Sequence, residues 1–355
     1  SSAASDVYKR QGEAIDLMKG MDADSPSRPF GGLEELSFTP DGRAVVFSTR
    51  DAGREEPWST DFDLYLTPID GSSAPRKLTG NNPAWDTQPT FSPDGRTLAW
   101  LAMKRPGYES DRLGIWVRAW PEGAPREVAG GWDRSATSLT WSADGKRLYT
   151  TADHLGQTAL FAIDVASGKV RTLVGEGHAG TPSVGGGLLV FGLDQLRSPT
   201  ELHTVRPDGK GLRAITQMNR EKVAATRMGV PEPFTFAGWN QETVHAYVVK
   251  PADFDPAKKY PVAFLIHGGP QGSFGNDFHY RWNPQAYAGA GFAAIMVDFH
   301  GSTGYGQAFT DAIRDDWGGK PFVDLQKGLE AALQRYPWMD GGRVCALGAS
   351  YGGYM

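Results

Sequence analysis

The sequence contains a single cysteine, Cys345, so no disulfide can form within its 355 residues. Cys345 stands in the apolar run 343–347, and this context predicts a cysteine buried in a strand rather than a reactive thiol. No apolar run reaches the roughly 18 residues that a membrane-spanning helix needs. A chain without disulfides fits the cytoplasm and also fits many periplasmic enzymes, so the compartment stays undetermined.

Positive charge is also scarce relative to negative charge. The 36 Lys and Arg residues face 41 Asp and Glu residues, which gives a formal net charge of −5 with no basic cluster. We therefore expect neither nucleic acid nor a membrane as a partner, and we predict no metal site and no cofactor. The chain is rich in other residues: 45 Gly, 24 Pro and 11 Trp indicate a turn-rich β protein over at least part of its length.

Three segments repeat one pattern, in which an aromatic residue is followed, after two intervening residues, by Asp-Gly, a basic residue and alternating apolar residues. The segments are 37–47, 90–100 and 140–149, and their Asp-Gly pairs begin at 41, 94 and 144, a period of about 50 residues. Asp-Gly between two such stretches predicts a hairpin, because glycine adopts positive φ without a steric penalty.

A second apolar hairpin segment follows in each repeat, at 64–71, 114–120 and 160–168, and a degenerate fourth unit runs from 184 to 209. Two hairpins per repeat make four strands, which is the composition of a β-propeller blade. We predict a partial β-propeller of about four blades over residues 12–217. A stacked sandwich is the alternative, but it does not explain the regular period.

The pattern changes in the polar, proline-bounded stretch 218–233, where we place a domain boundary. Apolar strand-like runs then alternate with helix-like segments. The predicted strands are 244–249, 262–266, 292–297 and 343–347, and the predicted helices are 284–290 and 322–335. This alternation predicts a parallel α/β sheet, and we interpret 218–355 as the N-terminal part of an α/β-hydrolase domain.

The last predicted strand runs into GASYG at 348–352, a G-x-S-x-G motif. A strand followed by glycine, serine and glycine is typical of a nucleophile elbow, whose tight turn lifts the serine hydroxyl above the sheet. Ser350 is therefore the predicted nucleophile. A plain glycine-rich turn with an exposed serine is the alternative.

The segment HGGP at 267–270 follows a predicted buried strand and is the second feature of the predicted active site, after Ser350. An oxyanion hole needs backbone N–H groups, and glycines allow a substrate carbonyl to approach them. We assign these donors to Tyr351 and to Gly268 and Gly269. In this fold the triad order is Ser, then Asp or Glu, then His, so His267, which precedes Ser350, is predicted to anchor the loop. By the same order Asp298 and Asp324 are expected to be structural.

Together, HGGP at 267–270, DFHGSTGYGQAF at 298–309, WGGKPFVDL at 317–325 and GASYGGYM at 348–355 resemble the prolyl oligopeptidase family, in particular its dipeptidyl-peptidase V and acylaminoacyl-peptidase branch. The resemblance implies a propeller that covers an α/β-hydrolase domain and admits short peptides. It also implies cleavage near the peptide N-terminus and leaves room for a homodimer. Prolyl-specific relatives have tyrosine where His267 stands, so strict proline specificity is not expected.

Some members of this family bind the substrate's free amino group with a pair of propeller glutamates, and Glu55 and Glu56 form such a pair here. The alternative is a solvated loop with Arg54 as counter-ion.

Residues 1–11 (SSAASDVYKRQ) match the in-frame translation of a transposase sequencing adapter, and no histidine follows Ser350. We therefore expect a fragment that stops after the nucleophile elbow and is inactive by itself, because serine without a base is a weak nucleophile. The leading interpretation of the parent is a serine exopeptidase. An esterase or lipase on the same fold, and a non-catalytic propeller module joined to a dead hydrolase domain, are the alternatives.

Overall fold

The computed structural model describes residues 13–355, and the predicted adapter segment lies outside them. The chain forms two compact units. Unit 1 comprises the described residues up to Glu109 together with Trp116–Pro125, and unit 2 comprises Ser110–Ile115 and Arg126–Met355. The predicted domain boundary at 217 falls inside unit 2 and stays a prediction. Within the described residues, every helix is too short or too polar to cross a bilayer.

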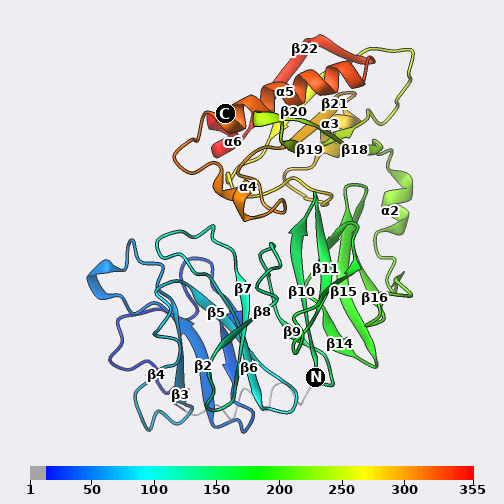
Figure 1. Cartoon of the computed structure of the whole chain (residues 1–355). Coiled ribbons are helices and arrows are strands. Elements are labelled where there is room, and N and C mark those ends of the chain that lie inside the picture. Colours follow the sequence, from blue (N-terminus) through cyan, green and yellow to red (C-terminus); the bar gives the residue numbers. More distant parts are fainter. Residues whose placement is uncertain (1–12) are drawn as a thin grey trace. The chain divides into compact units, whose positions relative to one another are not determined.

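The first eight strands form two four-stranded sheets, drawn in blue and cyan in Figure 1. The first sheet has the order β1-β2-β3-β4, with each neighbouring pair antiparallel. Its strands are β1 (Leu36–Phe38), β2 (Ala44–Thr49), β3 (Asp63–Pro68) and β4 (Arg76–Lys77). The second sheet has the order β5-β6-β7-β8. Its strands are β5 (Asp86–Phe91), β6 (Thr97–Ala102), β7 (Gly114–Ala119) and β8 (Arg126–Val128).

The next nine strands form one sheet that contains two further antiparallel groups of four. The first group is β9 (Thr140–Trp141), β10 (Arg147–His154), β11 (Gln157–Asp164) and β12 (Val170–Val174). The second group is β14 (Ser183–Gly185), β15 (Leu188–Gln195), β16 (Ser198–Val205) and β17 (Arg213–Ala214). Strand β13 (His178–Ala179) joins them, parallel to β11 and antiparallel to β15.

The Asp-Gly repeats form the hairpin turns that the sequence predicts. Gly42, Gly95 and Gly145 have φ angles of +68°, +70° and +67°, where a side chain would be strained. In the first turn, Asp41 Oδ1 accepts hydrogen bonds from Thr39 Oγ1 and from the N–H of Arg43. The same two kinds of bond recur at Asp94 and Asp144. The repeated sequence therefore specifies one repeated turn, which confirms the predicted hairpins.

A five-stranded sheet follows in the order β18-β19-β21-β20-β22. Its strands are β18 (Pro231–Ala237), β19 (Thr243–Val249), β20 (Tyr260–Ile266), β21 (Ala293–Asp298) and β22 (Met339–Gly348). Strand β20 is parallel to both β21 and β22. The predicted parallel arrangement holds for these three strands and not at the β18–β19 edge. There β18 and β19 form a hairpin through the short helix η3 (Trp239–Gln241), and β19 pairs antiparallel with β21.

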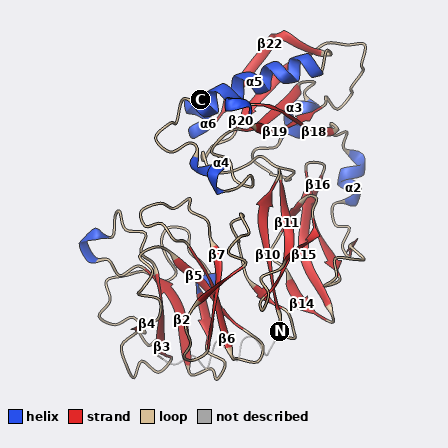
Figure 2. Cartoon of the chain, viewed as in Figure 1, coloured by secondary structure: helices blue, strands red, loops and turns tan. Residues whose placement is uncertain are grey.

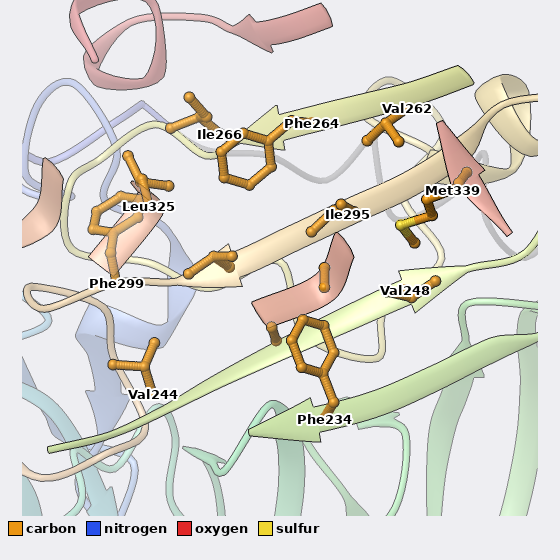
Figure 3. Packing of buried hydrophobic residues seen from close by; sticks show 14 of the residues in the cluster. Phe234, Val244, Val248, Val262, Phe264, Ile266, Ile295, Phe299, Leu325 and Met339 are labelled. Carbon is orange, nitrogen blue, oxygen red and sulfur yellow. The ribbon is translucent and has the colours of Figure 1, made fainter. Parts of the chain in front are cut away.

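Helices pack on both faces of this sheet (Figure 2). On one face, α5 (Lys320–Arg335) contributes Leu325 and Ala332 to a core that contains Phe264, Ile266 and Ile295, as Figure 3 shows for the labelled residues. On the other face, α3 (Pro284–Gly289) packs against the alternate strand residues, among them Leu265 and Met296. Successive side chains of β20 and β21 point to opposite faces of the sheet, and helices cover both faces. This explains why the two strands are apolar throughout. The remaining helices are α2 (Arg220–Ala225), α4 (Gln307–Asp311) and α6 (Tyr351–Tyr354).

The environment of Cys345 differs from the prediction. Cys345 lies in a strand, as expected, but its side chain is exposed rather than buried. Within residues 13–355, β22 pairs only with β20 and forms an edge of the sheet. An apolar strand sequence does not reveal whether the strand lies at the centre or at the edge of a sheet, so the prediction of burial was wrong.

Candidate active site

Strand β22 ends at Gly348, and α6 begins at Tyr351, which leaves Ser350 at the turn between them. Ser350 has φ +56° and ψ −124°, a combination that non-glycine residues rarely adopt. Such a conformation costs on the order of 1–3 kcal/mol and persists only where the surroundings impose it. The Ser350 side chain is exposed. The turn therefore has the strained geometry of a nucleophile elbow.

The glycines on either side of Ser350 are required by close backbone contacts. A Cβ atom added at Gly348 would lie 2.1 Å from the carbonyl oxygen of Gly352. A Cβ atom added at Gly352 would lie 2.1 Å from the carbonyl oxygen of Ile266, at the end of β20. Both distances are far inside van der Waals contact, so the spacing G-x-S-x-G follows directly from the tightness of this turn.

The HGGP loop lies directly against the elbow. A Cβ atom at Gly268 would lie 3.1 Å from the carbonyl oxygen of Ala349 and 3.5 Å from Ser350 Cβ. Gly269 has φ +122°, which glycine alone adopts readily, and the Gly269–Pro270 peptide is cis. The structure thus brings Gly268 and Ser350 together, as the sequence predicts.

Tyr351 supplies the other predicted oxyanion donor. It is the first residue of α6, where backbone N–H groups lack a partner within the helix. Its side chain is buried, donates a hydrogen bond from Oη to the carbonyl oxygen of Trp317 at 2.6 Å and lies edge-on to the Trp317 ring. The buried side chain fixes the start of α6 and leaves the N–H of Tyr351 next to Ser350. The assignment of this N–H to an oxyanion hole remains a prediction.

The contacts of His267 are those of a residue that anchors the loop. Its Nδ1 lies 2.7 Å from the carbonyl oxygen of Gly268 and its Nε2 lies 2.9 Å from Ser302 Oγ. The ring is buried and stacks on Phe299 with centroids 4.2 Å apart. Burial lowers the pKa of His267, which favours the neutral ring. A neutral His267 donates from Nδ1 to the carbonyl and accepts from Ser302, so neither nitrogen is available to Ser350.

Asp298, at the end of β21, holds the segment that follows the HGGP loop. Its Oδ2 accepts hydrogen bonds from Ser273 Oγ and, at 2.6 Å, from Tyr305 Oη. Its Oδ1 accepts from the N–H of Phe274 at 3.2 Å. Burial and the neighbouring Asp298 raise the pKa of Tyr305 well above its usual range, so the phenol remains a donor. Asp298 therefore links two loops beside the elbow and has a structural role.

Asp324 and His300 form a buried ion pair behind the site. His300 Nδ1 lies 2.6 Å from Asp324 Oδ2, and His300 Nε2 lies 3.1 Å from Glu242 Oε2. Asp324 also accepts hydrogen bonds at 2.7 Å from the backbone N–H groups of Trp239 and His300. Burial alone would lower the pKa of His300, but the two carboxylates raise it above its usual value. The pair ties α5 to the end of β21 and to η3.

We expect Asp324→Asn to destabilise the protein by about 3–5 kcal/mol at pH 6, because it leaves a buried cation without its closest partner. The folded-state pKa of His300 is raised, so its stabilisation is complete below the unfolded value of about 6.5 and is lost as the pH rises through the folded-state pKa. Urea unfolding from pH 5.5 to 9 measures this effect. The variant should lose less stability over that range than the wild type.

Asp340→Asn is the matched control for this substitution. Asp340 pairs with Arg343 at the surface, where ion pairs contribute about 0–1 kcal/mol. Equal effects of the two substitutions at pH 6 would contradict the role assigned to the buried pair.

A cavity of about 590 Å³ opens beside the elbow and the HGGP loop. Gly268 and Ser350 line it, together with a mainly apolar and aromatic wall. The wall includes Leu196, Leu265, Phe274, Trp282, Tyr287 and Met296. Sequence analysis identified none of these six as site residues, because isolated apolar residues carry no catalytic signal. Asp277, His279 and Arg281 add polar groups to the lining.

Among residues 13–355, one group of side chains has ligand atoms close enough to share a cation. His178, Asp194 and Asp277 place one such atom each within 4.8 Å of the others. His178 Nδ1 lies 3.1 Å from Asp194 Oδ2, and Asp194 also accepts from Thr200 Oγ1 and from the N–H of Phe278. Burial and Asp194 raise the pKa of Asp277 to about 6. These bonds account for the arrangement without a metal ion, so we assign none.

The predicted glutamate pair belongs to the other compact unit. Glu55 and Glu56 are exposed residues at the end of the short helix η2 (Gly53–Glu55), in unit 1, whereas Ser350 belongs to unit 2. Glu56 forms an ion pair with Arg50, which also lies over the Phe62 ring. The alternative of a solvated loop named Arg54 as the counter-ion, whereas the structure pairs Glu56 with Arg50. The role of the pair as an amine anchor stays a prediction.

Comparison with known proteins places these features in context. Residues 278–355 match the model of the prolyl oligopeptidase family. The chain is 35% identical to dipeptidyl-peptidase 5 of Aspergillus fumigatus over 98% of its length and 34% identical to that of Schizosaccharomyces pombe over 97%. It spans about half the length of the curated relatives it matches, since it covers 50% of each.

A solved structure with a similar fold is an acylaminoacyl peptidase in complex with Z-Gly-Gly-Phe-chloromethyl ketone. It superposes with a TM-score of 0.76 at 24% identity, over 90% of this chain and 48% of that one. At this identity the likeness concerns the fold alone. The strand groups β1–β17 and the sheet β18–β22 thus correspond to the propeller and the α/β-hydrolase parts of such a peptidase.

Proposed function

Because the chain belongs to the prolyl oligopeptidase family, we propose that it supplies the nucleophile and the oxyanion hole of a serine exopeptidase. The substrates are short peptides, cleaved near their N-terminus. The observation that carries the proposal is the strained Ser350, with Gly268 packed against it and the N–H of Tyr351 beside it. The four strand groups of β1–β17 support the partial propeller of about four blades.

The proposed reaction follows from this geometry. Ser350 Oγ attacks the carbonyl carbon of the scissile peptide bond, and its proton passes to a general base. The fold's chain order assigns that base to a histidine after Ser350, in agreement with the engagement of both nitrogens of His267. The backbone N–H groups of Tyr351 and of the Gly268–Gly269 segment stabilise the negative oxygen of the tetrahedral intermediate. The amine product leaves, and water hydrolyses the ester on Ser350.

A panel of peptidyl p-nitroanilides and acyl p-nitrophenyl esters tests the proposal on a full-length form of the protein, meaning one that spans the length of its relatives. We expect kcat/KM for dipeptidyl anilides to exceed that for N-blocked dipeptidyl anilides. A preference for the blocked compounds would instead support release of acylated amino acids, as the name of the structural relative indicates. Hydrolysis of the esters alone would support an esterase and contradict the peptidase.

The glutamate pair provides a separate prediction. If Glu55 binds the free amino group of the substrate, Glu55→Gln should raise KM for dipeptidyl anilides by about 10-fold or more, because an ion pair with the ammonium group is lost. Glu56 is already paired with Arg50, so Glu56→Gln should have the smaller effect. Steady-state kinetics of the two variants and of the double variant in the full-length form measure this. An unchanged KM in all three would refute the anchor.

A further inference from the structure

The turn between β15 and β16 carries a leucine that packs in the hydrolase core rather than in its own sheet. Leu196 is 1% exposed and belongs to the apolar cluster of Leu265, Met296 and the α3 residue Ala288. Leu193, three residues earlier on β15, belongs instead to the cluster between the strands β10–β16. Within unit 2, the hairpin β15–β16 therefore inserts one side chain into the hydrolase sheet's own core.

Both backbone groups of Leu196 are held by the hydrolase part of unit 2. Its N–H donates to Asn276 Oδ1 at 3.0 Å, and its carbonyl oxygen accepts from Gln285 Nε2 at 3.2 Å. Gln285 is itself held by Gly229, whose N–H donates to Gln285 Oε1 at 2.7 Å and whose carbonyl oxygen accepts from Nε2 at 3.0 Å. The position of the Leu196 side chain is consequently fixed from both sides.

Asn276 is fixed in turn by a second hairpin. Its N–H donates to the carbonyl oxygen of Gly156 at 2.8 Å, and its Nδ2 donates to Gln157 Oε1 at 3.1 Å. Gly156 and Gln157 form the tip of the β10–β11 hairpin, and Gln157 also donates to Tyr247 Oη at 2.6 Å. Two hairpin tips therefore determine where the segment after the HGGP loop lies.

Leu196 also lines the cavity that contains Ser350. Every other lining residue of that cavity lies between 265 and 350, so Leu196 is its one contribution from the strand groups β1–β17. The wall around it is apolar and aromatic, with Phe274, Tyr287 and Met296 among its members. A pocket of this composition selects among apolar side chains by their size.

We propose that Leu196 is a specificity-determining residue, which sets the size of the apolar side chain that the pocket accepts on the acyl side of the scissile bond. The proposal rests on the proposed function, because it takes the cavity next to Ser350 as a substrate pocket. A change of one methylene in an apolar pocket alters kcat/KM by about 10–200-fold, so a leucine that cannot move aside has a measurable effect.

The test compares Leu196→Ala and Leu196→Phe in the full-length form on the anilides Gly-Ala, Gly-Val, Gly-Leu and Gly-Phe. We expect Leu196→Ala to raise the kcat/KM ratio of Gly-Phe to Gly-Ala by about 10-fold or more, because it enlarges the pocket. Leu196→Phe should lower the same ratio. A uniform fall of kcat/KM for all four substrates, with constant ratios, would show a structural role only and would overturn the proposal.

Two further variants keep the test decisive if the alanine variant does not fold. Leu196→Met nearly conserves volume and should shift the ratio by a smaller factor in the folded protein. Leu193→Ala removes another buried leucine, which belongs to the cluster between the strands β10–β16. It should leave the kcat/KM ratio unchanged. A ratio that changes as much in Leu193→Ala as in Leu196→Ala would also overturn the proposal.

The same acyl series, prepared as p-nitrophenyl esters, separates this inference from the proposed function. If the wild type hydrolyses the esters but none of the anilides, the peptidase proposal fails, and the Leu196 variants still report on the pocket through the ester ratios. If the anilides are hydrolysed with ratios that no Leu196 variant alters, the peptidase proposal stands and the role of Leu196 is refuted.

Discussion

We expect Ser350→Ala to lower kcat for dipeptidyl anilides by at least about 10⁴-fold in the full-length form, because the substitution removes the hydroxyl that we propose as the nucleophile. Ser350 is exposed at a turn, so its hydroxyl contributes little to packing, and the melting temperature should remain within about 2 °C of that of the wild type. The combination of a large kinetic effect with a small thermal effect is the expected signature of a nucleophile.

The control for this substitution is another exposed serine. Ser72 lies at a turn in unit 1, where its backbone N–H donates a hydrogen bond to Asp70 Oδ1 at 3.0 Å. Alanine keeps this N–H, so Ser72→Ala should leave kcat unchanged and have little effect on stability. Residual activity of Ser350→Ala above about one per cent of the wild type would mean that another residue supplies the nucleophile.

Gly352→Ala has the second large effect, through geometry rather than chemistry. Its Cβ would lie 2.1 Å from the carbonyl oxygen of Ile266, so the elbow and the end of β20 must move apart. Movement there also displaces the HGGP loop, and a displacement of about 1 Å can reduce activity about 10²-fold. Overpacking of this kind costs about 1–3 kcal/mol. We expect kcat/KM to fall at least 10²-fold, together with a lower melting temperature.

Gly353→Ala is the matched control, since Gly353 is the next residue in the same helix. A Cβ atom there would lie 3.6 Å from the carbonyl oxygen of Gly348, which is ordinary contact. Alanine is favoured over glycine in helices by up to about 1 kcal/mol, so this variant should be as stable as the wild type or slightly more stable. If both variants behave alike, the close approach of Gly352 to β20 does not determine the activity.

The sequence predicts well what depends on local chemistry. The Asp-Gly turns, the strands 262–266 and 292–297 and the helix 322–335 all occur within a few residues of their predicted positions. The glycines around Ser350 were predictable for the same reason, because their requirement arises within one turn and from one neighbouring strand. The loop-anchoring role of His267 followed from chain order alone, and its contacts with Gly268 and Ser302 agree with it.

Features that depend on non-local neighbours were not predictable. The exposure of Cys345 is decided by which strands flank β22, and the antiparallel edge is decided by the pairing of β19 with β21. Leu196 is a single apolar residue in a turn, and only the tertiary structure places it in the wall of the cavity that Ser350 also lines.

Covalent labelling tests the central claim most directly. A fluorophosphonate reacts with an activated serine, whose Oγ displaces fluoride to give a phosphonylated enzyme. The full-length form should therefore be labelled once, on Ser350, and a dipeptidyl anilide present in excess should slow the labelling. Peptide mapping by mass spectrometry locates the adduct. The account predicts the adduct on the peptide that contains GASYGG, its absence in Ser350→Ala and much slower labelling in Gly352→Ala. Active enzyme that is inhibited by a label on any other residue would contradict it.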